Sequence, residues 1–291
     1  MTTPESAGPN TEQSQYWNEV GGPNWVALQE VLDEAHAPLG AVAMDRVEVA
    51  PGERVLDIGC GCGHTSLELA RRVGPGGFVL GIDISTPMLE RAGARAKEAG
   101  IANLRFENAD AQSFAFAPSE FDLLYSRMGV MFFDDPLPAF ENLLRALRPG
   151  GRMGFVCWRD TEENPWMSVP LSAAAKHIPI PERSSGAPGP SAFADSGRVR
   201  SMLEGAGFAD VAFEGLDTTI TIGGSGSLDE SVRNMLRFGL ISRAIRQANV
   251  QDTTEIAASL REAVAPYATP TGVRMKSACW VVTARRPLNT G

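Results

Sequence analysis

The sequence contains few residues of the kinds that bind metals or form disulfides. Its 291 residues include four cysteines and three histidines. The cysteines form no Cys-x-x-Cys pair and no Cys/His partners have zinc spacing, so we expect no metal site. Cys60 and Cys62 lie too close together in a tight loop for a structural disulfide. We expect these two, with Cys157 and Cys279, to be reduced thiols that fill apolar space.

The chain also lacks a long apolar run and an excess of positive charge. No run approaches the roughly 20 apolar residues that a membrane-spanning helix needs. The N-terminus has no basic and apolar signal pattern, so we expect a cytoplasmic protein. The 26 basic and 35 acidic residues give a net charge of −9. Without a Lys/Arg cluster, this balance argues against nucleic acid as the main partner, and we expect no membrane partner.

What the sequence does contain is a regular alternation of strand and helix patterns. An apolar content of 43%, with 30 glycines in addition, is ample for a full core. Alternating β and α units of this length predict a parallel sheet with helices on both faces. The predicted strands are 54–58, 78–83, 104–108, 121–126 and 151–158, and the helices between them are 65–73, 86–99, with Ser85 as N-cap, and 138–147.

The pattern changes on either side of this alternating core. Residues 1–13 are polar and we expect a disordered tail there, whereas 16–49 are mostly helical in pattern. Beyond Trp158 the sequence predicts helices at 164–177 and 195–205, a β-like run at 209–222, two helices within 227–265 around a break near Asn249, and a closing strand at 273–284.

These boundaries predict one domain over residues 14–291. Helical insertions in an α/β sheet lie at the carboxyl ends of strands and cover the site there. We therefore divide the domain into an N-terminal lid at 14–49, cap insertions at 161–190 and 224–269, and a core at 50–160, 191–223 and 270–287.

The most informative segment runs from Val55 to Thr65. An apolar strand leads into glycines at 59, 61 and 63, and a helical pattern follows. Such a loop lets a ligand approach the backbone at a helix N-terminus. The dinucleotide fingerprint G-x-G-x-x-G fits at its first two glycines, but His64 stands at the third. The loop alone therefore leaves the identity of the cofactor open.

Two acids after the next strands bear on that question. Asp83 ends the second strand, where a carboxylate can accept hydrogen bonds from ribose hydroxyls of NAD or of an adenosine-type ligand. Asp110 follows the third strand, where an acid can accept a bond from an adenine amino group. NAD binding does not require an acid at that place, which favours the adenosine-type ligand.

Five segments in order resemble the motifs of class I S-adenosylmethionine (SAM) dependent methyltransferases. The stretch 127–136 is similar to the ubiquinone/menaquinone-biosynthesis type and its bacterial secondary-metabolite relatives. The resemblance implies an α/β, Rossmann-like sheet of seven strands, mostly parallel, with helices on both faces and a helical cap. The antiparallel seventh strand would come from 273–284. The motif segments are 55–63, 81–85, 108–111, 121–127 and 147–152.

The resemblance also implies SAM as cofactor and assigns residue roles toward it. The loop glycines would approach its methionine and ribose, and two tryptophans of the lid would fold over it, one face contacting the sulfonium, unless they only pack the core. Asp57 would lie near the amino group, Asp83 would hold the ribose, and Ser126 would contact the methionine part through its backbone. The cofactor-binding candidates are Trp17, Trp25, Asp57, Gly59, Gly61, Gly63, Asp83, Ile84 on the adenine face, Asp110 and Ala111 on the adenine edge, and Ser126.

Methyl transfer from a sulfonium is an in-line displacement, so the enzyme mainly aligns the reactants and excludes water. A general base is needed only for a poor nucleophile. Of the histidines, we take His177, near the end of the first cap helix, as the candidate base, ahead of His36. His64 would lie beside the methionine carboxylate or in solvent.

Apolar residues at or after the ends of the fourth and fifth strands predict an apolar substrate pocket, although they also suit a core between cap and sheet. Arg127 would bind a carboxylate or phosphate of the substrate, or pair with Asp134 or Asp135. The substrate-binding candidates are Arg127, Met128, Met131, Phe132, Trp158, Trp166 and Phe238.

We therefore predict a SAM-dependent methyltransferase that acts on a small, largely apolar metabolite of secondary metabolism. The alternatives are a nicotinamide-dependent oxidoreductase, and a SAM-binding protein that does not transfer methyl and serves as a regulator or cyclase. The acceptor atom (C, N, O or S) does not follow from the sequence. A homodimer is compatible with it.

Overall fold

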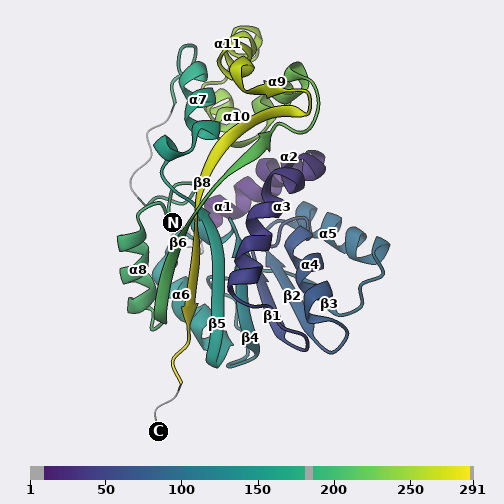
Figure 1. The fold of residues 1–291 in the computed structure, drawn as a ribbon, viewed down its shortest axis with the longest axis vertical. Coiled ribbons are helices and arrows are strands. Elements are labelled where there is room, and N and C mark those ends of the chain that lie inside the picture. Colours follow the sequence, from purple (N-terminus) through teal and green to yellow (C-terminus); the bar gives the residue numbers. More distant parts are fainter. Residues whose placement is uncertain (1–9, 181–185, 289–291) are drawn as a thin grey trace, which may run out of the picture.

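A single sheet organises the computed structural model, which describes residues 10–180 and 186–288. Its seven main strands lie in the order β3-β2-β1-β4-β5-β8-β6, and the two-residue β7 pairs with β8 (Figure 1). β8 is antiparallel to both of its neighbours, and strands β1 to β5 are parallel. The Rossmann-like α/β fold predicted above is confirmed, including the antiparallel seventh strand.

The strands agree closely with the predicted ones. β1 is apolar because helices cover both faces of the sheet, and its Val55, Leu56 and Ile58 are all buried. The strands are β1 (Arg54–Ile58), β2 (Phe78–Asp83), β3 (Leu104–Asn108), β4 (Phe121–Arg127), β5 (Leu147–Trp158), β6 (Ala209–Ile222), β7 (Ala268–Thr269) and β8 (Gly272–Arg285).

The core helices bury one apolar face each against this sheet. In α6 (Pro136–Ala146) the buried Ala139, Phe140, Leu143 and Ala146 follow helical spacing. Figure 1 shows α3, α4 and α5 on the face opposite α6 and α8. The other helices that pack on the sheet are α4 (His64–Val73), α5 (Thr86–Glu98), α8 (Ser196–Gly205) and α3 (Gln29–Arg46), which is also the last helix of the lid.

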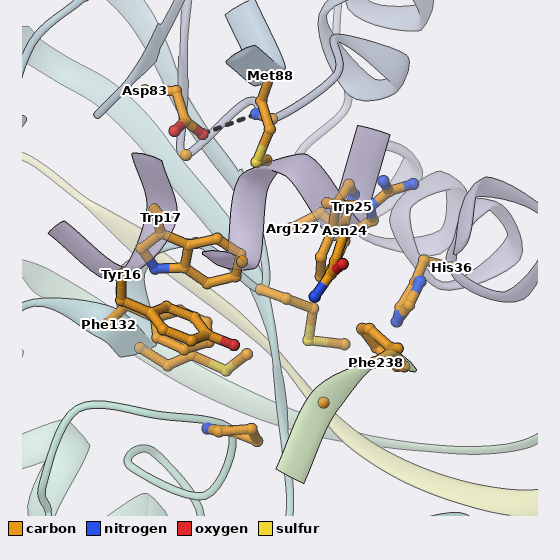
Figure 2. Close-up of a pocket in the computed structure, with 18 of the residues that line it drawn as sticks. Tyr16, Trp17, Asn24, Trp25, His36, Asp83, Met88, Arg127, Phe132 and Phe238 are labelled. Carbon is orange, nitrogen blue, oxygen red and sulfur yellow. Dashed lines mark hydrogen bonds between the residues drawn. The ribbon is translucent and has the colours of Figure 1, made fainter. Parts of the chain in front are cut away.

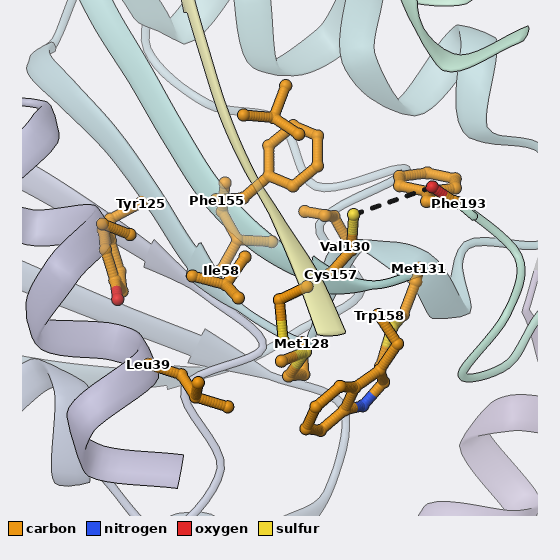
Figure 3. Packing of buried hydrophobic residues seen from close by; sticks show 14 of the residues in the cluster. Leu39, Ile58, Tyr125, Met128, Val130, Met131, Phe155, Cys157, Trp158 and Phe193 are labelled. Atoms are coloured by element: carbon orange, nitrogen blue, oxygen red, sulfur yellow. Dashed lines mark hydrogen bonds between the residues drawn. The ribbon is translucent and has the colours of Figure 1, made fainter. Parts of the chain in front are cut away.

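The two faces of the sheet have different cores. On the α3 face, the hydroxyl of the fully buried Tyr125 donates to the carbonyl of Gly40 over 2.9 Å. On the α6 face, Phe140 packs against Phe155 and Phe193. Figure 3 shows Tyr125 and Phe193 on opposite sides of the strands. The sheet is thus held rigidly between two packed layers.

Lid and cap lie together at the carboxyl ends of the parallel strands (Figure 1). The strands β6 and β8, 14 residues each, extend beyond the sheet and carry the cap. The cap helices are α7 (Pro165–Ala174), α9 (Leu228–Arg237), α10 (Gly239–Gln247) and α11 (Thr254–Val264), and the lid consists of α1 (Thr11–Tyr16), a π-helical turn (Trp17–Gly21), α2 (Gly22–Ala27) and α3.

The lid begins earlier than predicted. Residues 10–13 belong to it rather than to a disordered tail, because Asn10 is buried and α1 starts at Thr11. The remainder of the expected tail, residues 1–9, lies outside the described residues, as do 181–185 of the Pro/Ser/Gly-rich loop.

Ser85 stands at the N-cap of α5, as predicted, but its hydroxyl donates to the carbonyl of Trp17 over 2.8 Å and does not cap the helix. Asn18 of the lid supplies that cap, because its side-chain oxygen accepts from the Thr86 amide at 3.0 Å. The segment 227–265 forms three helices and not the two predicted, because the chain is extended at Phe238, with φ −133° and ψ 150°, between α9 and α10.

Candidate functional site

A cavity of about 230 Å³ opens where lid, cap and the carboxyl ends of the strands meet (Figure 2). All of the predicted substrate residues line it, from Arg127 to Phe238. The predicted cofactor residues that line it are Trp17, Trp25, Gly59, Gly61, Asp83, Ile84, Asp110 and Ala111. The cavity thus brings both predicted sets together.

The glycine loop forms one wall of this cavity. Gly59, Gly61 and Gly63 have φ values of 66°, 55° and 78°, in the region that only glycine adopts freely. A Cβ added to Gly59 would lie 2.8 Å from the Gly129 Cα, and one added to Gly61 would lie 2.8 Å from the Met88 Cε. The loop therefore needs glycine both for its conformation and for its close packing.

Asp83 binds this loop from the end of β2. Its carboxylate accepts the Gly61 amide at 2.8 Å and the Ser85 amide at 2.9 Å. Burial raises the pKa of Asp83, while backbone hydrogen bonds oppose the shift. A carboxylate offers about four lone-pair positions, so Asp83 can still accept bonds from hydroxyls of a ligand. The residues present therefore fit the ribose of SAM.

Three of the predicted cofactor residues, Asp57, Gly63 and Ser126, support the wall from behind and do not line the cavity. One oxygen of Asp57 accepts from the hydroxyls of Thr65 and Ser66, both at 2.6 Å. Its other oxygen is buried without a partner among the described residues. Burial raises the pKa of Asp57 to about 6. The Ser126 hydroxyl donates to the carbonyl of Ile58 over 2.7 Å.

Asp110 already holds the lid. The side-chain amide of Asn10 donates to both of its oxygens, at 2.9 and 3.0 Å, and the Asn10 side-chain oxygen accepts from the Asp134 amide at 2.7 Å. We call these three residues the lid latch. The adenine-edge role expected for Asp110 would have to share its carboxylate with this latch.

Arg127 lies on the cofactor side of the cavity, in a buried charged cluster. Its side chain is 10% exposed, and its Nη2 lies 3.7 Å from a carboxylate oxygen of Asp33. Its Nη1 lies 3.3 Å from Nδ1 of His64. Asp33 also pairs with Arg95 at 2.9 Å. Neither Asp134 nor Asp135 pairs with Arg127, so the expected alternative was wrong. The cluster sets two guanidinium groups against one carboxylate, which suits an anionic group of a ligand.

Aromatic side chains form the opposite wall. Trp25 contacts Phe238 edge-on at 5.6 Å, and Trp158 packs on Trp166 at 4.7 Å. Met128 also lines the cavity and has a φ of 61°, a conformation that residues other than glycine rarely adopt. Such strain is held in place only by its surroundings and is typical of ligand-binding positions. This wall suits an apolar, planar ligand.

His177 lies outside the cavity, which removes it as the candidate base. It is exposed, and its Nε2 hydrogen-bonds with the hydroxyl of Ser259 over 2.6 Å. The histidines that do line the cavity are His36 and His64. Burial and Arg127 lower the pKa of both, that of His36 to about 4. Both rings are therefore neutral near neutral pH.

Sequence reasoning missed several residues of the cavity and ranked His36 behind His177. Asp33 and His36 are three positions apart on one face of a helix, a spacing that could have pointed to Asp33. Asn10 and Asn24 gave no comparable signal. The missed residues are Asn10, Asn24 and Asp33, with Met88 of α5.

Residues 10–180 and 186–288 contain no cluster of three or more His, Cys, Asp or Glu that could hold a metal ion. No helix within these ranges is long and apolar enough to cross a bilayer. The four cysteines are free and buried, as predicted.

Residues 50–185 match a family profile described as a methyltransferase domain. An uncharacterized protein of Mycobacterium tuberculosis is 39% identical over 128 residues, which are 44% of this chain and 45% of that protein. Nocamycin O-methyltransferase of Saccharothrix syringae is 37% identical over 121 residues, 42% of this chain and 43% of that enzyme. The aligned segments span less than half the length of these two relatives.

Solved structures share the fold over more of the chain. The YcgJ protein from Bacillus subtilis superposes with a TM-score of 0.57 at 19% identity, covering 87% of this chain and 99% of that one. The matched residues 50–185 include the glycine loop, Asp83 and Asp110. This segment, slightly less than half of the chain, is therefore similar to a methyltransferase domain.

Proposed function

We propose that the protein transfers the methyl group of SAM to a small, largely apolar metabolite. The observation that carries this proposal is the single cavity that joins the glycine loop and Asp83 to an aromatic wall. The name of the similar nocamycin O-methyltransferase supports a small-molecule acceptor.

The residues of the cavity have distinct tasks in this proposal. The loop amides and Asp83 bind the ribose side of SAM, and the Arg127 cluster faces its anionic end. When bound, SAM supplies a methyl group activated by a positively charged sulfur. Trp25, Trp158 and Phe238 orient the acceptor and exclude water, which favours displacement because the reactants are held in line.

Thermal-shift titration tests the cofactor. SAM and its demethylated product, S-adenosylhomocysteine, should raise the melting temperature, and NADH should not. A rise with NADH alone would show that the oxidoreductase alternative is correct.

Turnover tests the reaction. Planar phenols, hydroxynaphthoquinones and hydroxyanthraquinones are incubated with SAM, and mass spectrometry follows the added methyl group and the release of S-adenosylhomocysteine. Methylated product with equal release supports the proposal. Tight SAM binding without product from any acceptor would favour the non-methylating alternative.

A further inference from the structure

The side chain of His36 is held in a fixed position at the aromatic wall of the cavity, where the methyl acceptor would bind. It lies in the middle of α3, is 5% exposed, and lines the cavity. The Trp25 ring stacks on it at 6.0 Å with an interplanar angle of 26°, and the Trp158 ring meets it edge-on at 5.8 Å. In Figure 2 the ring projects from its helix toward Phe238. The two indoles therefore fix the direction of the imidazole.

The hydrogen bond of His36 determines its tautomer. Its Nδ1 lies 2.6 Å from the carbonyl oxygen of Leu32. Because a carbonyl only accepts, Nδ1 carries the hydrogen, and in the neutral ring Nε2 then carries a lone pair. The bond from Nδ1 is the one hydrogen bond that the ring makes among the described residues, so Nε2 is left without a partner there. Nε2 of this cavity-lining residue is thus a proton acceptor that no other described residue occupies.

The charges around His36 come from three elements. Arg127 of β4 and His64 of α4 disfavour a charged imidazole, and so does burial, whereas Asp33 on its own helix favours one. The rings of Trp25 and Trp158 pack against it from α2 and β5, and Phe238 lies at the junction of α9 and α10; none of these carries a charge. The cap also contributes Arg237 and Arg243 to the lining of the cavity. The ring is therefore neutral at rest, with one carboxylate nearby that can stabilise a transient positive charge.

We propose that His36 is a catalytic residue whose Nε2 accepts the proton of a hydroxyl group on the acceptor. This inference rests on the proposed function and narrows its substrate class to phenols or enols on an otherwise apolar body. As the acceptor oxygen bonds to the methyl carbon, the carbon–sulfur bond breaks and its electron pair stays on sulfur. The hydroxyl proton passes to Nε2 and then to solvent. The positive charge that the sulfur loses appears on the imidazolium, so the total charge is unchanged.

The other buried titratable groups fit this task less well. The Nδ1 atom of His64 faces Arg127 at 3.3 Å. One oxygen of Asp57 is engaged by two hydroxyls, and the residue does not line the cavity.

Nitrogen NMR of histidine-labelled protein tests the ground state without any acceptor. Three variants that each lack one histidine assign the three rings. His36 should show the tautomer with hydrogen on Nδ1 and remain neutral at pH 6, because its pKa is about 4. Hydrogen on Nε2, or titration near the ordinary histidine pKa, would overturn the inference and leave the proposed function untouched.

Binding of a probe tests the free acceptor atom. Calorimetry with S-adenosylhomocysteine present compares 2-naphthol with 2-methoxynaphthalene, which cannot donate a hydrogen bond. His36→Phe should weaken the binding of 2-naphthol roughly 2- to 10-fold, which is the range for one neutral hydrogen bond. The affinity for 2-methoxynaphthalene should change by less than about 2-fold. Absence of any preference of the wild type for the naphthol would contradict the inference.

Turnover separates proton uptake from packing. His36→Gln keeps an acceptor oxygen but cannot take up a proton near neutral pH. With an acceptor identified as above, kcat at pH 7 should fall about 100-fold with little change in KM, and should recover as the pH approaches the acceptor's own pKa. The matched control, His177→Gln, should behave as wild type. Methylation by His36→Gln at the wild-type rate and pH profile would refute the role of His36. Absence of methylation by the wild type would instead refute the proposed function.

Discussion

The two walls of the cavity are built by different means. The cofactor wall consists of backbone amides, glycines and carboxylates from the short loops after β1, β2 and β3. The acceptor wall consists of large side chains from the lid, from the end of β5 and from the cap, which lie far apart in the sequence. Backbone conformation therefore determines the donor side of the site, and side-chain volume determines the acceptor side.

Gly59→Val should have the largest effect, on the cofactor wall. Valine would take a left-handed φ of 66° and place its Cβ 2.8 Å from the Gly129 Cα. Strain and overpacking together should lower the free energy of unfolding by about 3 kcal/mol and abolish detectable binding of S-adenosylhomocysteine. Urea unfolding and calorimetry measure both quantities.

The matched control is Gly93→Ala on the exposed face of α5, where an added Cβ meets nothing within 4 Å. It should stabilise the fold by ~0.5–1 kcal/mol and leave the affinity unchanged. Wild-type behaviour of Gly59→Val would show that the loop is less constrained than its backbone angles indicate.

Asp83→Ala tests the carboxylate of the same wall. It removes hydrogen bonds to a charged group, so affinity for S-adenosylhomocysteine should fall by about 2–3 kcal/mol, roughly 30- to 150-fold. Calorimetry checks this, with Asp229→Ala in the exposed cap pair with Arg261 as the control. Unchanged affinity would remove Asp83 from the site.

Each side of the site has a buried titratable group, and the two respond to pH in opposite senses. Folded Asp57, with its pKa near 6, keeps a proton that the unfolded chain releases near 4, so its stabilising effect is lost as pH rises through this range. Folded His36, with its pKa near 4, resists a proton that the unfolded chain binds below about 6.5, so stability is lost as pH falls through that range.

Variants at the two positions should therefore diverge. Between pH 4 and 7, the free energy of unfolding of Asp57→Asn should rise by about 2 kcal/mol relative to that of the wild type as the pH increases. That of His36→Phe should rise by a similar amount relative to the wild type as the pH decreases. Urea unfolding at several pH values measures both. Parallel curves for either variant would show that its group is not shifted in the fold.

Trp25→Leu tests whether the side chain of Trp25 contacts the cofactor or the methyl acceptor. The resemblance placed Trp25 at the cofactor. Its ring contacts Trp17, also a cofactor candidate, on one side and His36 and Phe238 on the other. We expect the acceptor KM to rise about 10-fold, or about 1.4 kcal/mol, with affinity for S-adenosylhomocysteine within about 2-fold. The reverse pattern in steady-state kinetics and calorimetry would return Trp25 to the cofactor side.

His177→Ala should have the smallest effect. The ring is exposed and bonds only to Ser259 among the described residues. Stability should change by less than about 0.5 kcal/mol, and kcat by less than about 2-fold. A large loss of kcat in the turnover assay would restore His177 as the base.

The cofactor side could be predicted because its signals are local. The strand 54–58, the glycines after it and Asp83 each follow from residue type and short spacing. The position of the proposed acceptor base could not, because it depends on which histidine the tertiary packing turns inward. His36 lies in the middle of α3, beneath the cap, whereas His177 lies in the turn after α7, which ends at Ala174, before the end at residue 177 that the sequence predicted. Asn10 was missed because its partners lie 100 and 124 residues away.

The fastening of the lid has a consequence for timing. Asn10 fixes it to the loop after β3, and Asn18 fixes it to the start of α5 after β2, while α3 of the same lid carries His36 over the acceptor. One segment therefore closes both halves of the site at once. We expect exchange of the spent donor and escape of the product to share a single opening step, so that neither can be accelerated by mutation of the latch without the other.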